Sequence, residues 1–243
     1  MSSVSPAVTP DIVKSLAPTG TLRATINLGN MVLAQGTPDA PRGVTVDLAR
    51  ELARRLGVPV TFTCFPGAGE AFEGFHTQGL DIVFLAIEPV RAEQVEFTAP
   101  YVIIEGVYMV WKDSPLKTVA DVDREGVRIG ATRRAAYELY LTRTLKHATL
   151  VRADDGIAAF VEQKLEAAAG IKQAVVAHAK ALPDVRVMDG RFMEIRQAMG
   201  TQKGRTVGST YLRAFVEEMK ASGFVAEALK RSNQPDASVA PPG

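Results

Sequence analysis

The chain has 243 residues, of which 47% are hydrophobic and 23% charged, a composition typical of globular proteins. Its formal net charge is +1, which excludes the strong positive field that attracts nucleic acid or acidic membranes. The lone cysteine, Cys64, excludes an intramolecular disulfide and argues against a cysteine-based metal site. The length suits one large domain or two small ones.

Cys64 lies in the apolar run VTFTCF, so we expect a buried structural thiol rather than a reactive one. His76, His147 and His178 are scattered without HxxxH or HxH spacing, and we interpret them as surface residues. We therefore expect neither a metal nor a cofactor.

The two ends of the chain carry little structural signal. Residues 1–18 form an irregular leader without the basic and apolar regions of a signal peptide. The protein either works in the cytoplasm or has lost a leader. Residues 233–243 are polar and proline-rich, which predicts a flexible tail. No apolar run approaches the roughly 18 residues of a membrane span.

The first half of the chain alternates predicted strands and helices. Thr21–Leu28 reads as a strand, and residues 29–43 read as a loop rich in glycine and proline. Leucines then recur every fourth residue along a helix, Val44–Leu56, which Gly57 follows as the usual terminating glycine. The strand Val58–Phe65, the helix Glu70–Gly79 and the strand Leu80–Ile87 complete this series.

A second series begins near Glu105, and Val107–Trp111 is its first predicted strand. Thr118 and Asp121 have the spacing of a capping box. The further predictions are strands at Gly126–Ala131 and Val185–Gly190, helices at Ala135–His147, Gly156–Ala168 and Lys172–Leu182, and two helices within Ser209–Ser232, broken at Ser222-Gly223. Continuous apolar strands alternating with helices predict mainly parallel sheets flanked by helices, hence an α/β protein with two lobes.

Four segments resemble one family, the bacterial extracellular solute-binding proteins of family 3, which are periplasmic binding proteins of the amino-acid type. They are, in chain order, GTLRATINL, GVTVDLARELARRLGV, GLDIVFLAIEPVRAEQVEFTAPY and YLRAFVEEMKASGFVAEALKRS. The third resembles the family segment usually written G-x-x-D, a strand, T-x-x-R and FS-x-PY. The likeness covers residues 19–232.

The resemblance implies the type II Venus-flytrap fold of such proteins. Lobe 1 would contain 19–104 and 200–232, and lobe 2 would contain 105–199. Two hinge crossings, near Glu105-Gly106 and Ala198-Met199, would allow the lobes to close on a small ligand held in an interlobe cleft. The implied protein is a periplasmic monomer that serves an ABC permease or a sensor.

Arg91 occupies the position at which the family pairs an arginine with the ligand's carboxylate. A planar guanidinium matches a carboxylate and stays charged at every relevant pH. The alternative is an arginine on a surface helix, paired with Glu88 or Glu93. Ala86 and Glu88 stand near positions where the family often has hydroxyls, so the contacts of this loop with the ligand would differ.

In lobe 2 the resemblance points to Arg134, Ala135 and Lys172. Ala135 replaces a family hydroxyl at a helix start, where backbone N–H groups bind anions. Arg134 would add a cation, or would simply be a solvated arginine before the helix. Lys172 lies where the family has an aspartate for the ligand's ammonium group, and would suit an anion unless it is a plain surface lysine.

In lobe 1, Asn27 and Asn30 replace an acidic residue that often follows the first strand. The loss of acidic groups predicts a small organic anion, such as a dicarboxylate, and makes a typical free amino acid a poor ligand, because a buried ammonium needs a counter-charge. An amino-acid-like ligand remains the broader expectation, and no nucleic-acid partner is expected.

Two other functions remain open at this stage. Some proteins of this fold are cyclohexadienyl dehydratases, for which Glu88, Glu105 and Glu166 would be candidate acids. None lies in a distinctive motif, so we assign no catalytic residue and expect a binding protein rather than an enzyme. A cytoplasmic regulatory or ligand-binding module is the other alternative.

Overall fold

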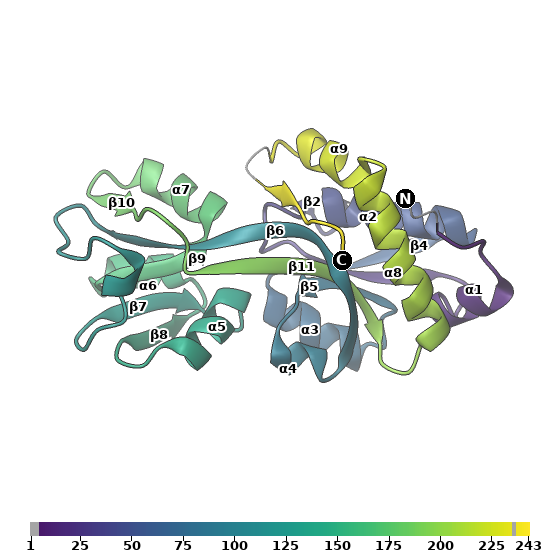
Figure 1. Ribbon diagram of the computed structural model, residues 1–243, viewed down its shortest axis with the longest axis horizontal. Coiled ribbons are helices and arrows are strands. Elements are labelled where there is room, and N and C mark those ends of the chain that lie inside the picture. Colours follow the sequence, from purple (N-terminus) through teal and green to yellow (C-terminus); the bar gives the residue numbers. More distant parts are fainter. Residues whose placement is uncertain (1–4, 235–236) are drawn as a thin grey trace. The chain divides into compact units, whose positions relative to one another are not determined.

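The computed structural model describes residues 5–234 and 237–243, and its chain forms two compact units. Unit 1 contains residues 1–103 and 196–243, and unit 2 contains residues 104–195. Both combine strands and helices (Figure 1), which confirms the α/β class. The chain changes unit at Ile103-Ile104 and Ile195-Arg196. The sequence predicted crossings near Glu105-Gly106 and Ala198-Met199.

The sheet of unit 1 has the strand order β4-β1-β5-β11-β6. Strand β1 pairs in parallel with both β4 and β5, and β11 pairs antiparallel with β5. The bounds are β1 Leu22–Asn27, β4 Val60–Phe65, β5 Ile82–Ala86, β6 Val95–Trp111 and β11 Met193–Gln202. Strands β6 and β11 both continue into unit 2.

Helix α2, Val44–Leu56, forms as its leucine pattern predicts. Its leucines are buried, and Gly57 ends the helix with a φ of 69° that suits glycine. The other elements of unit 1 are α1 Pro10–Leu16, β2 Gln35–Thr37, β3 Ala40–Arg42, α3 Ala68–Thr77, α4 Pro89–Ala92, α8 Thr206–Ala221, α9 Phe224–Arg231 and β12 Ser238–Val239.

Several predictions for unit 1 differ from the structure. The supposedly irregular leader contains α1, which Thr9 caps with its hydroxyl and which buries Ile12 and Leu16. The predicted loop before α2 contains the β2–β3 hairpin. Cys64 is only half-buried, because β4 is the edge strand of its sheet.

The ends of the chain also differ from expectation. Residues 235–236 of the tail predicted to be flexible lie outside the described residues. The described remainder includes β12, which pairs with β6, and Ala240, which is buried. His76 is partly buried and not a surface residue, since its ring meets Phe72 and Phe75 edge-on.

Unit 2 has the strand order β6-β9-β7-β8, with β10 also paired to β6. Its elements are a 3₁₀ turn Val119–Asp121, β7 Arg128–Thr132, α5 Ala136–Thr144, β8 Thr149–Ala153, α6 Gly156–Glu162, β9 Ala167–Ile171, α7 Lys172–Ala181 and β10 Val185–Val187. The predicted capping box of Thr118 and Asp121 is present at the 3₁₀ turn.

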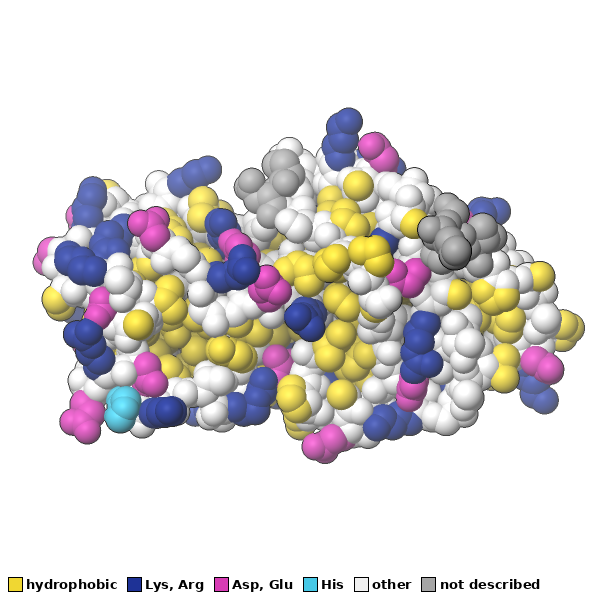
Figure 2. Space-filling view, in the orientation of Figure 1, with side chains coloured by type: hydrophobic (Ala, Val, Ile, Leu, Met, Phe, Trp, Pro, Cys, Tyr) yellow, Lys and Arg dark blue, Asp and Glu magenta, His cyan; other side chains and the backbone are white. Residues whose placement is uncertain are grey.

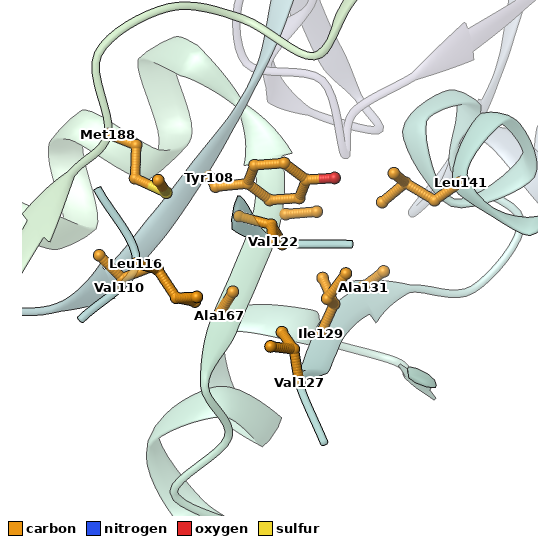
Figure 3. Packing of buried hydrophobic residues seen from close by; sticks show 11 residues of the cluster. Tyr108, Val110, Leu116, Val122, Val127, Ile129, Ala131, Leu141, Ala167 and Met188 are labelled. Atoms are coloured by element: carbon orange, nitrogen blue, oxygen red, sulfur yellow. The ribbon is translucent and has the colours of Figure 1, made fainter. Parts of the chain in front are cut away.

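Two apolar cores cover opposite faces of this sheet, since alternate residues of β6 and β9 belong to different cores. One core, drawn in Figure 3, contains Tyr108 of β6, Ile129 of β7 and Leu141 of α5. The other contains Met109 of β6 and Phe160 of α6. Helix α5 therefore covers one face of the sheet, and α6 the other.

The predicted helix Gly156–Ala168 is wrong in its second half. Helix α6 ends at Glu162, and Ala167–Ile171 is the strand β9. This strand lies between β6 and β7 with residues 167–170 buried, so its neighbours in the sheet override the helical preference of alanine. Strands β8 and β11 were not predicted either.

Candidate functional site

The candidate residues of unit 1 lie where β1 and β5 end. These strands are parallel neighbours, so their carboxyl ends lie at the same end of the sheet. Open α/β sheets usually bind ligands beyond this end. Asn27 is the last residue of β1, and Ala86 is the last of β5. Glu88 precedes the short helix α4, whose Pro89 stands at the favoured first position.

Arg91 is buried, with 2% of its surface exposed. Its Nη1 donates a hydrogen bond of 3.2 Å to the carbonyl of Ala86. Burial lowers the pKa of Arg91 to about 10, and attraction from Glu88 opposes this shift. The guanidinium therefore stays protonated at neutral pH.

The two asparagines shape the loop that follows β1. Asn27 Oδ1 accepts the N–H of Gly29 at 3.0 Å, and Asn30 Oδ1 accepts the N–H of Val32 at 3.2 Å. Such local turns are a common use of asparagine. Both amide oxygens thus stabilise the backbone of the loop after β1, at the end of the sheet where Ala86 also lies.

In unit 2, Arg134 and Ala135 connect β7 to α5. Arg134 is exposed and has a φ of 57°, a conformation that glycine would adopt more easily. Its backbone N–H donates to Oε2 of the buried Glu138 at 3.0 Å. Ala135 is the N-cap residue and makes no side-chain capping bond. The backbone donor immediately before the N-cap is therefore engaged by Glu138.

Glu138 is itself held in place. Its Oε1 accepts hydrogen bonds from Arg152 Nε at 2.7 Å and from Thr142 Oγ1 at 2.8 Å. These contacts join α5 to β8 and fix the loop that carries Arg134. Glu138 has no sequence signal of a ligand site, and its support of this loop was not predicted.

Lys172 is the first residue of α7, and its partner is a carboxylate. Lys172 Nζ lies 2.7 Å from Glu105 Oε2, and Arg191 Nη1 lies 3.0 Å from Glu105 Oε1. These two hydrogen bonds, with Lys172 the larger cause, lower the pKa of Glu105. Arg191 also pairs with Glu194 at 2.7 Å. The Lys172–Glu105 pair was not predicted, because its members are far apart in sequence.

Glu105 and Glu166 are both poorly suited to donate a proton near neutral pH. The two cations beside Glu105 stabilise its charged form. Arg128 similarly lowers the pKa of Glu166 through a hydrogen bond of 2.9 Å. An effective general acid needs a pKa near the working pH. Among the described residues, no group of three or more His, Cys, Asp or Glu side chains is arranged to hold a metal ion.

Charges of both signs mix on the face drawn in Figure 2, where Lys and Arg side chains lie among Asp and Glu side chains. No helix in the described part of the chain is both long and apolar enough to cross a bilayer.

Comparison with known proteins identifies a family. Solved structures with the same fold include an amino acid ABC transporter substrate-binding protein from Streptococcus pneumoniae bound to L-arginine, with a TM-score of 0.75 and 16% identity over 91% of this chain and 98% of that chain. A putative ABC transporter binding component from Wolinella succinogenes, complexed with lysine, has a TM-score of 0.74 and 21% identity, covering 87% and 95%.

An ancestral amino-acid-binding protein, described as a precursor of cyclohexadienyl dehydratase, has a TM-score of 0.73 and 22% identity over 90% of this chain and 97% of that chain. These likenesses confirm the predicted type II fold. The comparison with curated protein sequences finds no match. The family model for bacterial extracellular solute-binding proteins, family 3, matches residues 31–233. The chain therefore belongs to that family of solute-binding proteins.

Proposed function

We propose that this protein captures a small carboxylate-bearing solute outside the cytoplasm, as the binding component of an ABC transporter or a sensor. The observation that carries the proposal is the buried guanidinium of Arg91, which has a pKa of about 10. Arg91 follows the carboxyl end of β5, and open α/β sheets usually bind ligands beyond the carboxyl ends of their strands. Its planar donors suit a carboxylate. Under this proposal Arg91 exchanges part of its present contacts for the ligand.

The proposed ligand is an anion with a second acidic or neutral group rather than a free cationic amino acid. Asn27 and Asn30 are neutral, and Lys172 and Arg191 already surround Glu105, the carboxylate beside α7. A ligand's ammonium group would have to compete with both cations for Glu105. A ligand carboxylate could instead attract Lys172, while Glu105 keeps its contact with Arg191.

Titration calorimetry with succinate, glutarate, L-glutamine, L-arginine and L-lysine tests the proposal. We expect a dicarboxylate to bind most tightly. Arg91→Gln should weaken that binding by about 10- to 100-fold, since hydrogen bonds to charged groups contribute roughly 1.5–3 kcal/mol. Arg91→Lys should weaken it less, because the charge is retained.

The exposed Arg54 on α2 provides the matched control, and Arg54→Gln should leave affinity unchanged. Circular dichroism must show that each variant is folded. Equal affinity of folded Arg91→Gln and wild type would overturn the assignment of Arg91. Tight binding of L-lysine or L-arginine would instead overturn the preference for anions.

The proposal assigns no catalytic step. The lowered pKa values of Glu105 and Glu166 argue against these two carboxylates as general acids. Incubation with prephenate and with arogenate, followed by chromatography, should show no turnover above the rate without protein. Product formation that depends on this protein would favour the dehydratase alternative.

A further inference from the structure

The C-terminal segment Ser238–Gly243 runs alongside β6 in the antiparallel direction. Ser238 pairs with Ile103, and Val239 pairs with Val102. The N–H of Ala240 then donates to the carbonyl of Tyr101 at 3.1 Å. A Cβ added to Gly243 would lie 2.5 Å from the Cβ of Ala99, so the contact continues to that residue. In Figure 1 the C-terminal end lies beside β6.

Lys220 of α8 fastens this segment. Its Nζ donates to the carbonyl of Pro241 at 2.9 Å and to that of Pro100, on β6, at 3.2 Å. It also forms an ion pair of 2.6 Å with Glu217, and its side chain is only 5% exposed. The ammonium group therefore has two hydrogen-bond acceptors, both backbone carbonyls, and one ion-pair partner. One buried cation therefore holds the segment, β6 and α8 together.

The position of these contacts along β6 is the informative point. In unit 1, β6 is the last strand after β11, so its other edge would be open without β12. The segment covers that edge from Ala99 to Ile103, and Ile103 is the last residue of unit 1 before the chain crosses into unit 2. A strand paired on both edges resists bending more than an edge strand does.

We propose that Ser238–Gly243 is a strap that fixes β6 to unit 1 up to Ile103, so that any bending of this crossing is confined to the residues that follow. The strap thereby limits the range of orientations between the two units. This role goes beyond solute binding and does not depend on the identity of the solute.

Two variants test the role of the strap independently. One is a truncation after Ala237, and the other is Lys220→Met, which removes the ammonium but keeps most of the side-chain length. Hydrogen exchange measured by mass spectrometry should show exchange of the Ala99–Ile103 peptide rising about tenfold or more in both, because its outer pairing is lost. Lys14→Met, an exposed lysine on α1, is the matched control.

The decisive readout is the distance between the units. Spin labels at Lys180→Cys and Lys203→Cys, both exposed positions, in a Cys64→Ser background would report the distance distribution by pulsed EPR. We expect this distribution to broaden in both strap variants and not in Lys14→Met. A distribution identical to that of the wild type would overturn the proposal, even if exchange increases.

A proline pair covers the case in which the truncated protein does not fold. Ala240→Pro removes the N–H that bonds Tyr101 and should broaden the distribution. Val239→Pro is its control, since bonding alternates along an antiparallel pair and the N–H of Val239 points away from β6. If the two proline variants broaden the distance distribution equally, or if neither broadens it, the proposed role of the strap is wrong.

Discussion

At the scale of single residues, an ion pair between α2 and α8 makes the stability of unit 1 depend on pH. Arg55 donates two hydrogen bonds of 2.8 Å to Glu218. This contact, helped by Ser5, lowers the pKa of Glu218 from 4.5 to about 2. Because the folded pKa is the lower one, the stabilisation is complete above about pH 4.5 and is lost as the pH falls towards 2.

We therefore expect Glu218→Gln to lower the free energy of unfolding at pH 7, and the difference from wild type to shrink between pH 4.5 and 2. Urea unfolding across this range measures it. The exposed Glu227 on α9 is the control, and Glu227→Gln should follow the wild-type profile. A difference between Glu218→Gln and wild type that is constant with pH would contradict the prediction.

At the scale of elements, α6 and β7 approach each other at backbone distance. A Cβ on Gly130 would lie 2.3 Å from the carbonyl oxygen of Gly156, and a Cβ on Gly156 would lie 2.5 Å from the Cα of Ala131. Neither contact is possible for a real side chain. The two glycines therefore set the distance between this helix and its sheet.

Gly156→Ala distinguishes packing from helix propensity. Propensity alone favours alanine over glycine by up to about 1 kcal/mol, whereas overpacking costs roughly 1–3 kcal/mol. We expect a net loss of stability in thermal unfolding. Ala158→Gly, on the same helix, should show only the propensity cost. A higher melting temperature for Gly156→Ala would refute the close contact.

Elements with a strong pattern of their own could be predicted, and those defined by their neighbours could not. The leucine repeat of α2 and the apolar run of β5 predict both elements from local sequence. Strand β9 has the sequence AAAGI, which suits a helix equally well, and only its place between β6 and β7 makes it a strand.

The same distinction holds for the candidate site. The motif around Arg91 indicates its position after β5, but its burial and its contact with Ala86 depend on the folded turn. The pairing of Glu105 with both Lys172 and Arg191 joins three distant segments. A single sequence has no signal for such pairs, so the prediction offered Lys172 only as an anion-binding cation or as a plain surface lysine.

At the scale of the whole molecule, the two units differ in the number of chain segments from which they are built. Unit 2 is one continuous segment whose two cores lie entirely within it. Unit 1 is built from two segments, and β11 of the second lies between β5 and β6 of the first. Removal of the second segment therefore takes a strand from the interior of the sheet.

We expect the fragment Ile104–Ile195 to unfold cooperatively by circular dichroism and the fragment Met1–Ile103 to lack a cooperative transition. Joining Met1–Ile103 to Arg196–Gly243 through a short glycine-serine linker should restore cooperativity, because β11 is supplied again. A cooperative transition in Met1–Ile103 alone would show that β11 is dispensable.

The interior place of β11 also has a consequence for biosynthesis. While the ribosome is translating, the nascent polypeptide can complete unit 2 before residues 196–202 have emerged, but it cannot complete unit 1. The unit that is begun first is finished last, so its apolar strand edges stay available to chaperones until the end of translation.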